Sequence, residues 1–235
     1  LAPCGPDDII LKIHACGICG SDVRTYKVGL RKNVAGFESQ ILGHEFTGTV
    51  SEAGKNVVNY KPGDLIAVAP DVCCGQCWYC RRGLVNLCDN HRMLGVDWPG
   101  GFAEYAVLPA KYCCVINRLA DKLGDKMAAL EAGALAEPTA VAYSGMQING
   151  GGVKPGAYVA VFGTGPIGLA SIALARAFGA ATIFAFGTNP ERDRLAAAMG
   201  ADVVANPDDL LAQGSSAGAL VMEQTDGIGA GMIVE

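Results

Sequence analysis

Short runs that alternate apolar and polar residues dominate the chain up to about residue 150. Gly, Pro and Asp separate these runs, which read IILKIHA, FTGTVSEAG, DLIAVAP and AEYAVLPA. Strands at this spacing are typical of a β-rich, barrel-like domain. An Ala-rich helical stretch follows from Met127 to Met146, and the Gly-rich segment INGGGVKPG at 148–156 predicts a connection between domains.

The pattern changes after residue 150, where apolar runs alternate with helical periods. The strand-like runs are AYVAVFG, ATIFAF and DVVAN, and the helical ones are PIGLASIALARAFGA and PERDRLAAAMGA. This alternation predicts an α/β, doubly wound parallel sheet with helices on both faces. GMIVE reads as the start of a further strand. We therefore expect domains at 1–150 and 151–235, the second one partial, in a chain truncated at both ends.

The composition narrows the function classes. Hydrophobic residues make up 51% of the chain, the formal net charge is -5 and the pI is about 5.2. No basic field exists to attract nucleic acid or an anionic membrane, so a small-molecule partner is favoured. No apolar run approaches a membrane span, and LAPCGPDDII lacks the pattern of a signal peptide. We expect a cytoplasmic protein.

Cysteines concentrate in residues 73–88, CCGQCWYCRRGLVNLC. A disulfide cluster and a metal site are the two interpretations, and a reducing cytoplasm favours metal. The spacing Cys74-x2-Cys77-x2-Cys80-x7-Cys88 lets a turning loop present four thiolates to one ion, which predicts a closed, structural zinc site. Cys73 is left over. Such a cluster alone would equally fit a zinc-ribbon module that binds nucleic acid.

Residues suited to a second metal site stand in CGICGSD at 16–22, GHE at 43–45 and AEP at 136–138. A catalytic zinc needs mixed ligands and an open position, and these segments offer the right types: Cys19, His44, Glu45 and Glu137. Each of them alone also fits a structural role, as a core thiol, a buried turn histidine or a surface acid.

A glycine motif follows the run AYVAVF and opens a helical segment. It consists of Gly163, Thr164, Gly165, Pro166, Ile167 and Gly168. Glycines in this context permit a tight turn and close approach of a pyrophosphate to the helix N-terminus. The motif predicts a dinucleotide site.

The order CGICGSD, GHEFTGTV, the four-cysteine lobe, GGFAEYAV, AEP and GxGxxG resembles the zinc-dependent medium-chain alcohol dehydrogenase family. The stretch AEPTAVAYSGM is most similar to the polyol, sorbitol and threonine dehydrogenase branch. The resemblance implies a GroES-like catalytic domain, a Rossmann domain, two zinc ions and a homodimer or homotetramer. It implies hydride transfer between a nicotinamide cofactor and a secondary alcohol or polyol, or the corresponding ketone.

The resemblance also implies roles for individual residues. Cys19 and His44 match the catalytic zinc ligands, while Glu45 and Glu137 match acids at or near the metal. Ser21 matches the hydroxyl that passes a proton from the substrate. Asp22 matches the acid that orients the ligating histidine, and Cys16 is expected to be structural.

The position that holds the ribose-binding acid in an NAD site is Gly187 by the same resemblance. A glycine removes the charge that repels a 2'-phosphate, and Thr188, Asn189 and Arg192 could contact that phosphate. We expect NADP to be favoured over NAD. The alternative is that Arg192 and Arg194 only form a solvated helix face and that NAD is accepted with less selectivity.

Two alternative functions remain open from the sequence. One is a reductase of the same superfamily that works without catalytic zinc, which the set Cys19, His44, Glu45 and Glu137 disfavours. The other is the zinc-ribbon binding module, which explains neither the glycine motif nor the acidic charge.

Overall fold

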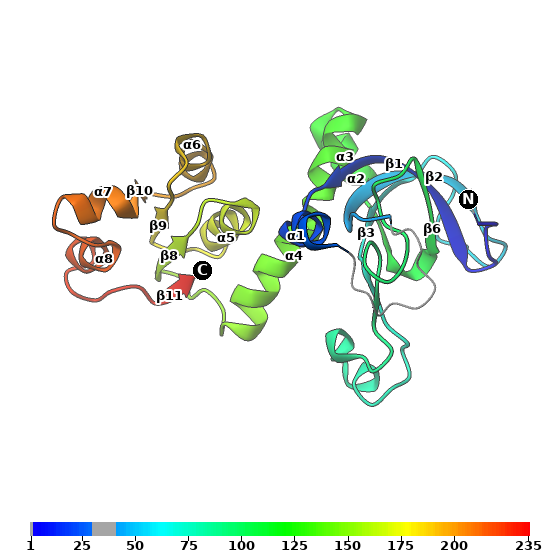
Figure 1. The fold of residues 1–235 in the computed structure, drawn as a ribbon, viewed down its shortest axis with the longest axis horizontal. Coiled ribbons are helices and arrows are strands. Elements are labelled where there is room, and N and C mark those ends of the chain that lie inside the picture. Colours follow the sequence, from blue (N-terminus) through cyan, green and yellow to red (C-terminus); the bar gives the residue numbers. More distant parts are fainter. Residues whose placement is uncertain (1, 30–40) are drawn as a thin grey trace. The chain divides into compact units, whose positions relative to one another are not determined.

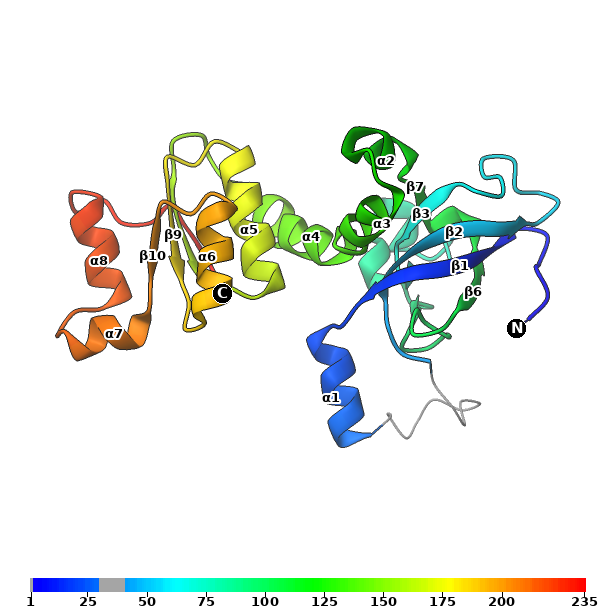
Figure 2. The same ribbon diagram turned by 90° about the horizontal axis from the view of Figure 1, so that it is seen from above.

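The computed structural model describes residues 2–29 and 41–235, and Figures 1 and 2 show its helices and strands from two directions. The chain divides into two compact units, Leu1–Glu137 and Pro138–Glu235. The boundary expected at residue 150 therefore lies within the second unit. The reason is packing, because Met146 and Val153 are buried in the hydrophobic cluster that also holds the second unit's strand residues.

The first unit is built on an antiparallel sheet in the order β6-β1-β2-β3-β7. Its strands are β1 (Asp8–Gly17), β2 (Glu45–Ala53), β3 (Leu65–Val68), β6 (Tyr105–Pro109) and β7 (Cys113–Val115). Alternate residues of β1, Ile9 and Leu11, are fully buried and pack with Phe46 of β2. The alternation seen in the sequence thus reflects one buried face.

Three helices accompany this sheet: α1 (Gly20–Val28), α2 (Asn117–Leu123) and α3 (Lys126–Ala134). Helix α3 packs on the sheet, where its Ala129 and Leu130 are buried against Leu65. The buried Thr47 hydroxyl on β2 also donates a hydrogen bond of 2.7 Å to the Leu130 carbonyl. The short strands β4 (Asp71–Val72) and β5 (Arg92–Met93) pair with each other and enclose the cysteine lobe.

The second unit holds a parallel sheet in the order β10-β9-β8-β11. Its strands are β8 (Tyr158–Phe162), β9 (Thr182–Phe186), β10 (Val203–Ala205) and β11 (Met232–Val234). This order is the first part of the doubly wound arrangement, with the crossover between β8 and β11 as its switch point. The run GMIVE does form a strand, as its sequence indicated.

Helices cover both faces of the parallel sheet. They are α5 (Pro166–Ala177), α6 (Pro190–Ala198), α7 (Pro207–Ala212) and α8 (Ala217–Gln224). Helix α4 (Ala136–Tyr143), continued by a π-helical turn (Ser144–Asn149), precedes the sheet in the chain. Ile172 of α5 and Ala196 of α6 pack on one face, and Val221 of α8 packs on the other. The sequence pattern did not predict α7 and α8. Within the described parts of the chain, no helix has both the length and the apolar character needed to cross a membrane.

Candidate metal and cofactor sites

The first candidate site lies where β1 ends and β2 begins. Gly17, the last residue of β1, is the register partner of Glu45, the first residue of β2. The chain then turns through Cys19, which is the N-cap residue of α1. Antiparallel pairing therefore brings CGICGSD and GHE together although they are distant in sequence.

His44 is held in place by the backbone on its N-terminal side. Residues 41–43 pair with residues 100–102, with hydrogen bonds that include Gly101 N to Gly43 O at 2.7 Å and Phe102 N to Leu42 O at 2.9 Å. Gly43 has a φ of 89°, and a Cβ built there would lie 2.8 Å from Cys16 Sγ. A glycine is therefore required directly before the histidine, both for the left-handed backbone and for the close approach.

Asp22 connects the two segments. Its carboxylate, 5% exposed, accepts hydrogen bonds from Cys19 N at 2.9 Å and from Gly43 N at 3.3 Å. The same carboxylate lies 3.7 Å from Nδ1 of His44, which is 2% exposed and has no hydrogen-bond partner for that nitrogen among the described residues. The buried acid thus faces one edge of the imidazole, which leaves the other nitrogen for a ligand.

The ligand atoms of Cys19, His44 and Glu45 lie within 4.8 Å of one another. One thiolate, one imidazole and one carboxylate form a mixed set, which suits a zinc ion that keeps a position open. The acid behind the imidazole is also the arrangement by which proteins orient histidine ligands. The mixed donor set, with the Asp22 carboxylate 3.7 Å from Nδ1 of His44, therefore fits zinc.

Glu137, on the first turn of α4, does not belong to this cluster of three. Burial and then the negative charges of Glu45 and Asp71 raise the pKa of Glu137 to about 7. A nearby cation would lower the pKa of such a carboxyl group again, so that it would ionise more readily. Its position is thus near the cluster electrostatically, while direct ligation stays a prediction.

Cys16 and Ser21 differ from the three clustered residues. Cys16 packs against the core of the first unit, and burial followed by the charge of Asp22 raises the pKa of its thiol to about 12. A thiol of this kind stays protonated, which agrees with the expected structural role. Ser21 is an exposed residue of the first turn of α1, two positions after Cys19, so its proton-passing role stays a prediction.

The second candidate metal site is the cysteine lobe, where the sulfur atoms of Cys74, Cys77, Cys80 and Cys88 lie within 4.8 Å of one another. The predicted set of four is therefore brought together. Cys73 is excluded, because it packs against the core and its backbone N–H donates to the Tyr112 hydroxyl at 2.9 Å. The disulfide interpretation is not supported, since all these cysteines are free.

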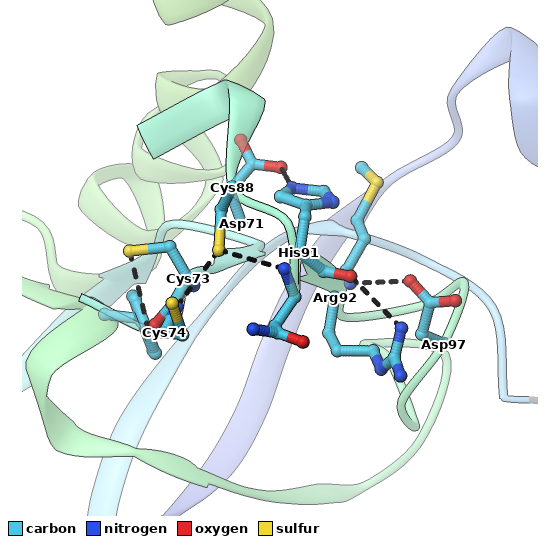
Figure 3. A network of polar contacts seen from close by, with 10 residues as sticks. Asp71, Cys73, Cys74, Cys88, His91, Arg92 and Asp97 are labelled. Carbon is cyan, nitrogen blue, oxygen red and sulfur yellow. Dashed lines mark hydrogen bonds and ion pairs between the residues drawn. The ribbon is translucent and has the colours of Figure 1, made fainter. Parts of the chain in front are cut away.

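Backbone N–H groups already point at the sulfur atoms of the lobe. Cys88 Sγ accepts from Cys74 N and from Asn90 N, both at 3.3 Å (Figure 3). The N–H groups of Gln76 and Cys77 lower the pKa of Cys74 to about 6, whereas burial and the neighbouring thiols raise that of Cys80 to about 12. Four neighbouring thiols cannot all lose their protons without a cation, because the thiolates would repel one another. Zinc would supply that charge in a closed tetrahedral site.

Sequence reasoning assigned no partner to His91, which the structure pairs with Asp71 at 2.8 Å between Nε2 and Oδ1 (Figure 3). Asp71 lies on β4, before the cysteines, and His91 lies just before β5. The pair therefore joins the two ends of the lobe. Nothing in the spacing of these two residues indicates the contact.

The glycine motif forms the turn between β8 and α5, as predicted. Gly163 has a φ of 94°, and a Cβ on Gly168 would collide with the Gly163 carbonyl oxygen. These two glycines are therefore required by the turn itself. Gly165 differs, because its φ is -76° and a Cβ there would meet no atom within 4 Å. Open space beside a glycine at a helix N-terminus fits close approach of a phosphate.

Residues at the end of β9 have mixed roles. Gly187 is buried, while Thr188, Asn189 and Arg192 are exposed. The side-chain oxygen of Asn189 caps α6, where it accepts from the N–H groups of Glu191 and Arg192, both at 3.1 Å. A helix cap is thus sufficient to explain Asn189, whose amide nitrogen stays available as a donor.

A contact that the sequence did not indicate lies beside Gly187. The hydroxyl of Thr164, in the glycine motif, donates to Oδ1 of Asp193 on α6 at 2.9 Å. Thr164 is 4% exposed. The contact joins the glycine motif to the first turns of α6.

Comparison with known proteins identifies the family of the chain. Residues 5–118 match the family model for the alcohol dehydrogenase GroES-like domain, and residues 166–235 match the model for zinc-binding dehydrogenases. The chain belongs to the zinc-binding alcohol dehydrogenase family, in the branch of polyol and threonine dehydrogenases. The zinc-ribbon interpretation accounts for neither match.

Two curated relatives and one solved structure illustrate the similarity. Scyllo-inosose 3-dehydrogenase of Thermotoga maritima is 38% identical over 98% of this chain and 59% of its own length. L-threonine 3-dehydrogenase of Caldanaerobacter subterraneus is 35% identical over 98% of this chain and 62% of its own length. The structure of a zinc-binding dehydrogenase of Sinorhizobium meliloti 1021, solved with NADP, is 37% identical in sequence and has a TM-score of 0.77. The match covers 88% of this chain and 57% of that one. The chain thus spans about three fifths of the length of these relatives.

We predict that the purified chain binds two zinc ions, and that Cys19→Ala and His44→Ala each bind one. Loss of one ligand from a set of three leaves too few donors to hold the ion in the open site, whereas the cysteine lobe is untouched. Elemental analysis of dialysed protein measures the ratio. Cys16→Ala is the matched control and should retain two ions, since its thiol stays protonated. Two ions in Cys19→Ala would contradict the assignment.

We also predict that two glycine substitutions in the same turn affect different properties, one the stability of the fold and the other the binding of ADP. Gly168→Ala should lower the free energy of unfolding by about 1–3 kcal/mol, because its Cβ meets a backbone carbonyl. Gly165→Ala should cost no more than about 1 kcal/mol but weaken ADP binding by roughly tenfold or more, because the methyl group fills the phosphate approach. Urea denaturation and calorimetric titration with ADP measure the two effects. Equal ADP affinity in Gly165→Ala and the parent would refute the phosphate role.

Proposed function

We propose that the protein is a zinc-dependent oxidoreductase that transfers a hydride between a nicotinamide cofactor and a secondary alcohol or polyol, or the corresponding ketone. The observation that carries the proposal is the cluster of Cys19, His44 and Glu45 with the buried Asp22 behind the imidazole. A structural metal site has no need of an incomplete, mixed ligand set, whereas a catalytic one does.

Each residue near the cluster has a part in this chemistry. Zinc held by Cys19 and His44, with Glu45 beside them, would polarise a carbonyl or lower the pKa of an alcohol. Asp22 keeps the ring of His44 in one orientation, since its carboxylate is fixed by two backbone N–H groups. Ser21 would pass the substrate proton outward, as the family resemblance implies. Glu137 would make the site harder and more accommodating to water.

The substrate class rests on the relatives. Their names give scyllo-inosose and L-threonine as substrates, and a sorbitol dehydrogenase of Bacillus subtilis is 36% identical over 85% of this chain. Inositol derivatives, threonine and sorbitol all carry secondary hydroxyl groups. We therefore propose a secondary alcohol or polyol as substrate for this chain.

For the cofactor, we propose that NADP is favoured over NAD. Support comes from Gly187, which carries no strand-end acid, from the exposed Arg192, and from the NADP-bound relative. Two zinc ions per chain and assembly as a homodimer or homotetramer complete the proposal. A reductase that works without catalytic zinc would not explain why three potential zinc ligands are clustered.

The direct test is isotope transfer. With sorbitol or another polyol deuterated at the carbon to be oxidised, we expect the reduced cofactor to carry deuterium at C4 of its nicotinamide, detected by mass spectrometry. His44→Ala should lower the rate by roughly a thousandfold or more, because Lewis-acid stabilisation is worth several kcal/mol. Cys16→Ala should keep the parent rate. Absence of deuterium at C4 across the polyol panel, or an unchanged rate in His44→Ala, would refute the proposal.

A further inference from the structure

The end of β9 lacks the acid that an NAD site places there. In doubly wound dinucleotide sites this acid holds the 2'-hydroxyl of the adenosine ribose and repels a 2'-phosphate. Gly187 follows directly after β9, and the glycine motif lies beside it, since Gly163 N donates to Phe186 O at 2.8 Å. The backbone is thus arranged for the acid, although the residue has no side chain.

The space beside Gly187 is nevertheless filled by a carboxylate. A Cβ built on Gly187 would collide with Oδ1 of Asp193 and would lie 2.5 Å from Oγ1 of Thr164. Gly187 is therefore buried by these two side chains. Asp193 occupies the volume into which the side chain of a strand-end acid would begin to extend.

Asp193 is held in this position rather than left free on the helix. Its Oδ1 accepts the hydrogen bond of 2.9 Å from Thr164, and Thr164 is buried between two glycines of the motif. Its backbone N–H donates to Asn189 O at 2.9 Å within α6. The structure describes no hydrogen bond to the other carboxylate oxygen, so that atom stays available as an acceptor.

We propose that Asp193, positioned by Thr164, takes the place of the missing strand-end acid and sets the balance between NAD and NADP. This rests on the proposed dinucleotide site. The carboxylate accepts from a ribose 2'-hydroxyl and repels a 2'-phosphate, so it opposes the preference for NADP that Gly187 and Arg192 favour. Removal of its charge should increase selectivity for the 2'-phosphate.

A purely structural role for Asp193 would explain the same contact, since an acid in the first turns of a helix is favourable and the bond joins α6 to the glycine motif. The two roles are separable. In Asp193→Asn the amide oxygen still accepts from Thr164, so the joint is preserved while the charge is lost. A structural role therefore predicts no change in ligand selectivity for this variant.

The experiment compares two ligands that differ by a single phosphate, AMP and adenosine 2',5'-bisphosphate, by calorimetric titration of the chain. For Asp193→Asn we expect the ratio of the AMP dissociation constant to that of the bisphosphate to rise by roughly tenfold, because a like charge is removed near the 2'-position. Asp193→Ala should raise the same ratio of dissociation constants. If Asp193→Asn fails to fold, the alanine variant tests the role of the Asp193 charge in its place.

Glu191→Gln is the matched control, because it removes a negative charge from an exposed position two residues earlier on the same helix. Its ratio should stay within about twofold of the parent, as expected for a solvent-screened charge. An unchanged ratio in Asp193→Asn and Asp193→Ala, with both ligands bound, would overturn the role of Asp193 and leave the proposed function standing. Failure of the parent to bind either ligand would overturn both.

Discussion

The arrangement of the candidate open metal site depends on one buried carboxylate. Asp22 accepts backbone hydrogen bonds from Cys19 at 2.9 Å and Gly43 at 3.3 Å, so it ties together the two segments that carry the cysteine and histidine ligands. Burial of a charge is costly unless it is partnered. The two N–H groups and the imidazole edge of His44, 3.7 Å away, supply the partners. The positions of Cys19 and His44 therefore follow from the need to provide hydrogen-bond and charge partners for the buried carboxylate of Asp22.

The two candidate metal sites would hold the same kind of ion by different physical means. In the lobe, backbone N–H groups from Cys74 and Asn90 point at sulfur and favour thiolates in a site closed by four donors. In the candidate open site, the imidazole of His44 faces the carboxylate of Asp22, and Glu137, whose pKa is raised to about 7 by burial and by the charges of Glu45 and Asp71, lies near the cluster. We expect the first arrangement to stabilise the fold and the second to leave room for a reacting molecule.

The sequence predicted the main strands and the four-cysteine set, because each depends on local spacing. For the open site it proposed Cys19, His44, Glu45 and Glu137 by resemblance, and the structure brings the ligand atoms of the first three together. The boundary expected at residue 150 falls within the second compact unit, Pro138–Glu235, because the burial of Met146 and Val153 depends on tertiary packing. The sequence also missed the Asp71 to His91 pair and the Thr164 to Asp193 bond. Contacts between side chains that lie far apart in sequence have no periodicity, so the pattern of residues does not contain them.

The central claim is that one chain holds a closed and an open zinc site, and the location of the ions tests it most directly. Anomalous diffraction at the zinc edge from crystals of the zinc-loaded chain should give two peaks. One is expected about 2.3 Å from the sulfur atoms of the lobe, and the other at bonding distance from Cys19 and His44. A single peak in the lobe, or a second peak away from Cys19 and His44, would contradict the account.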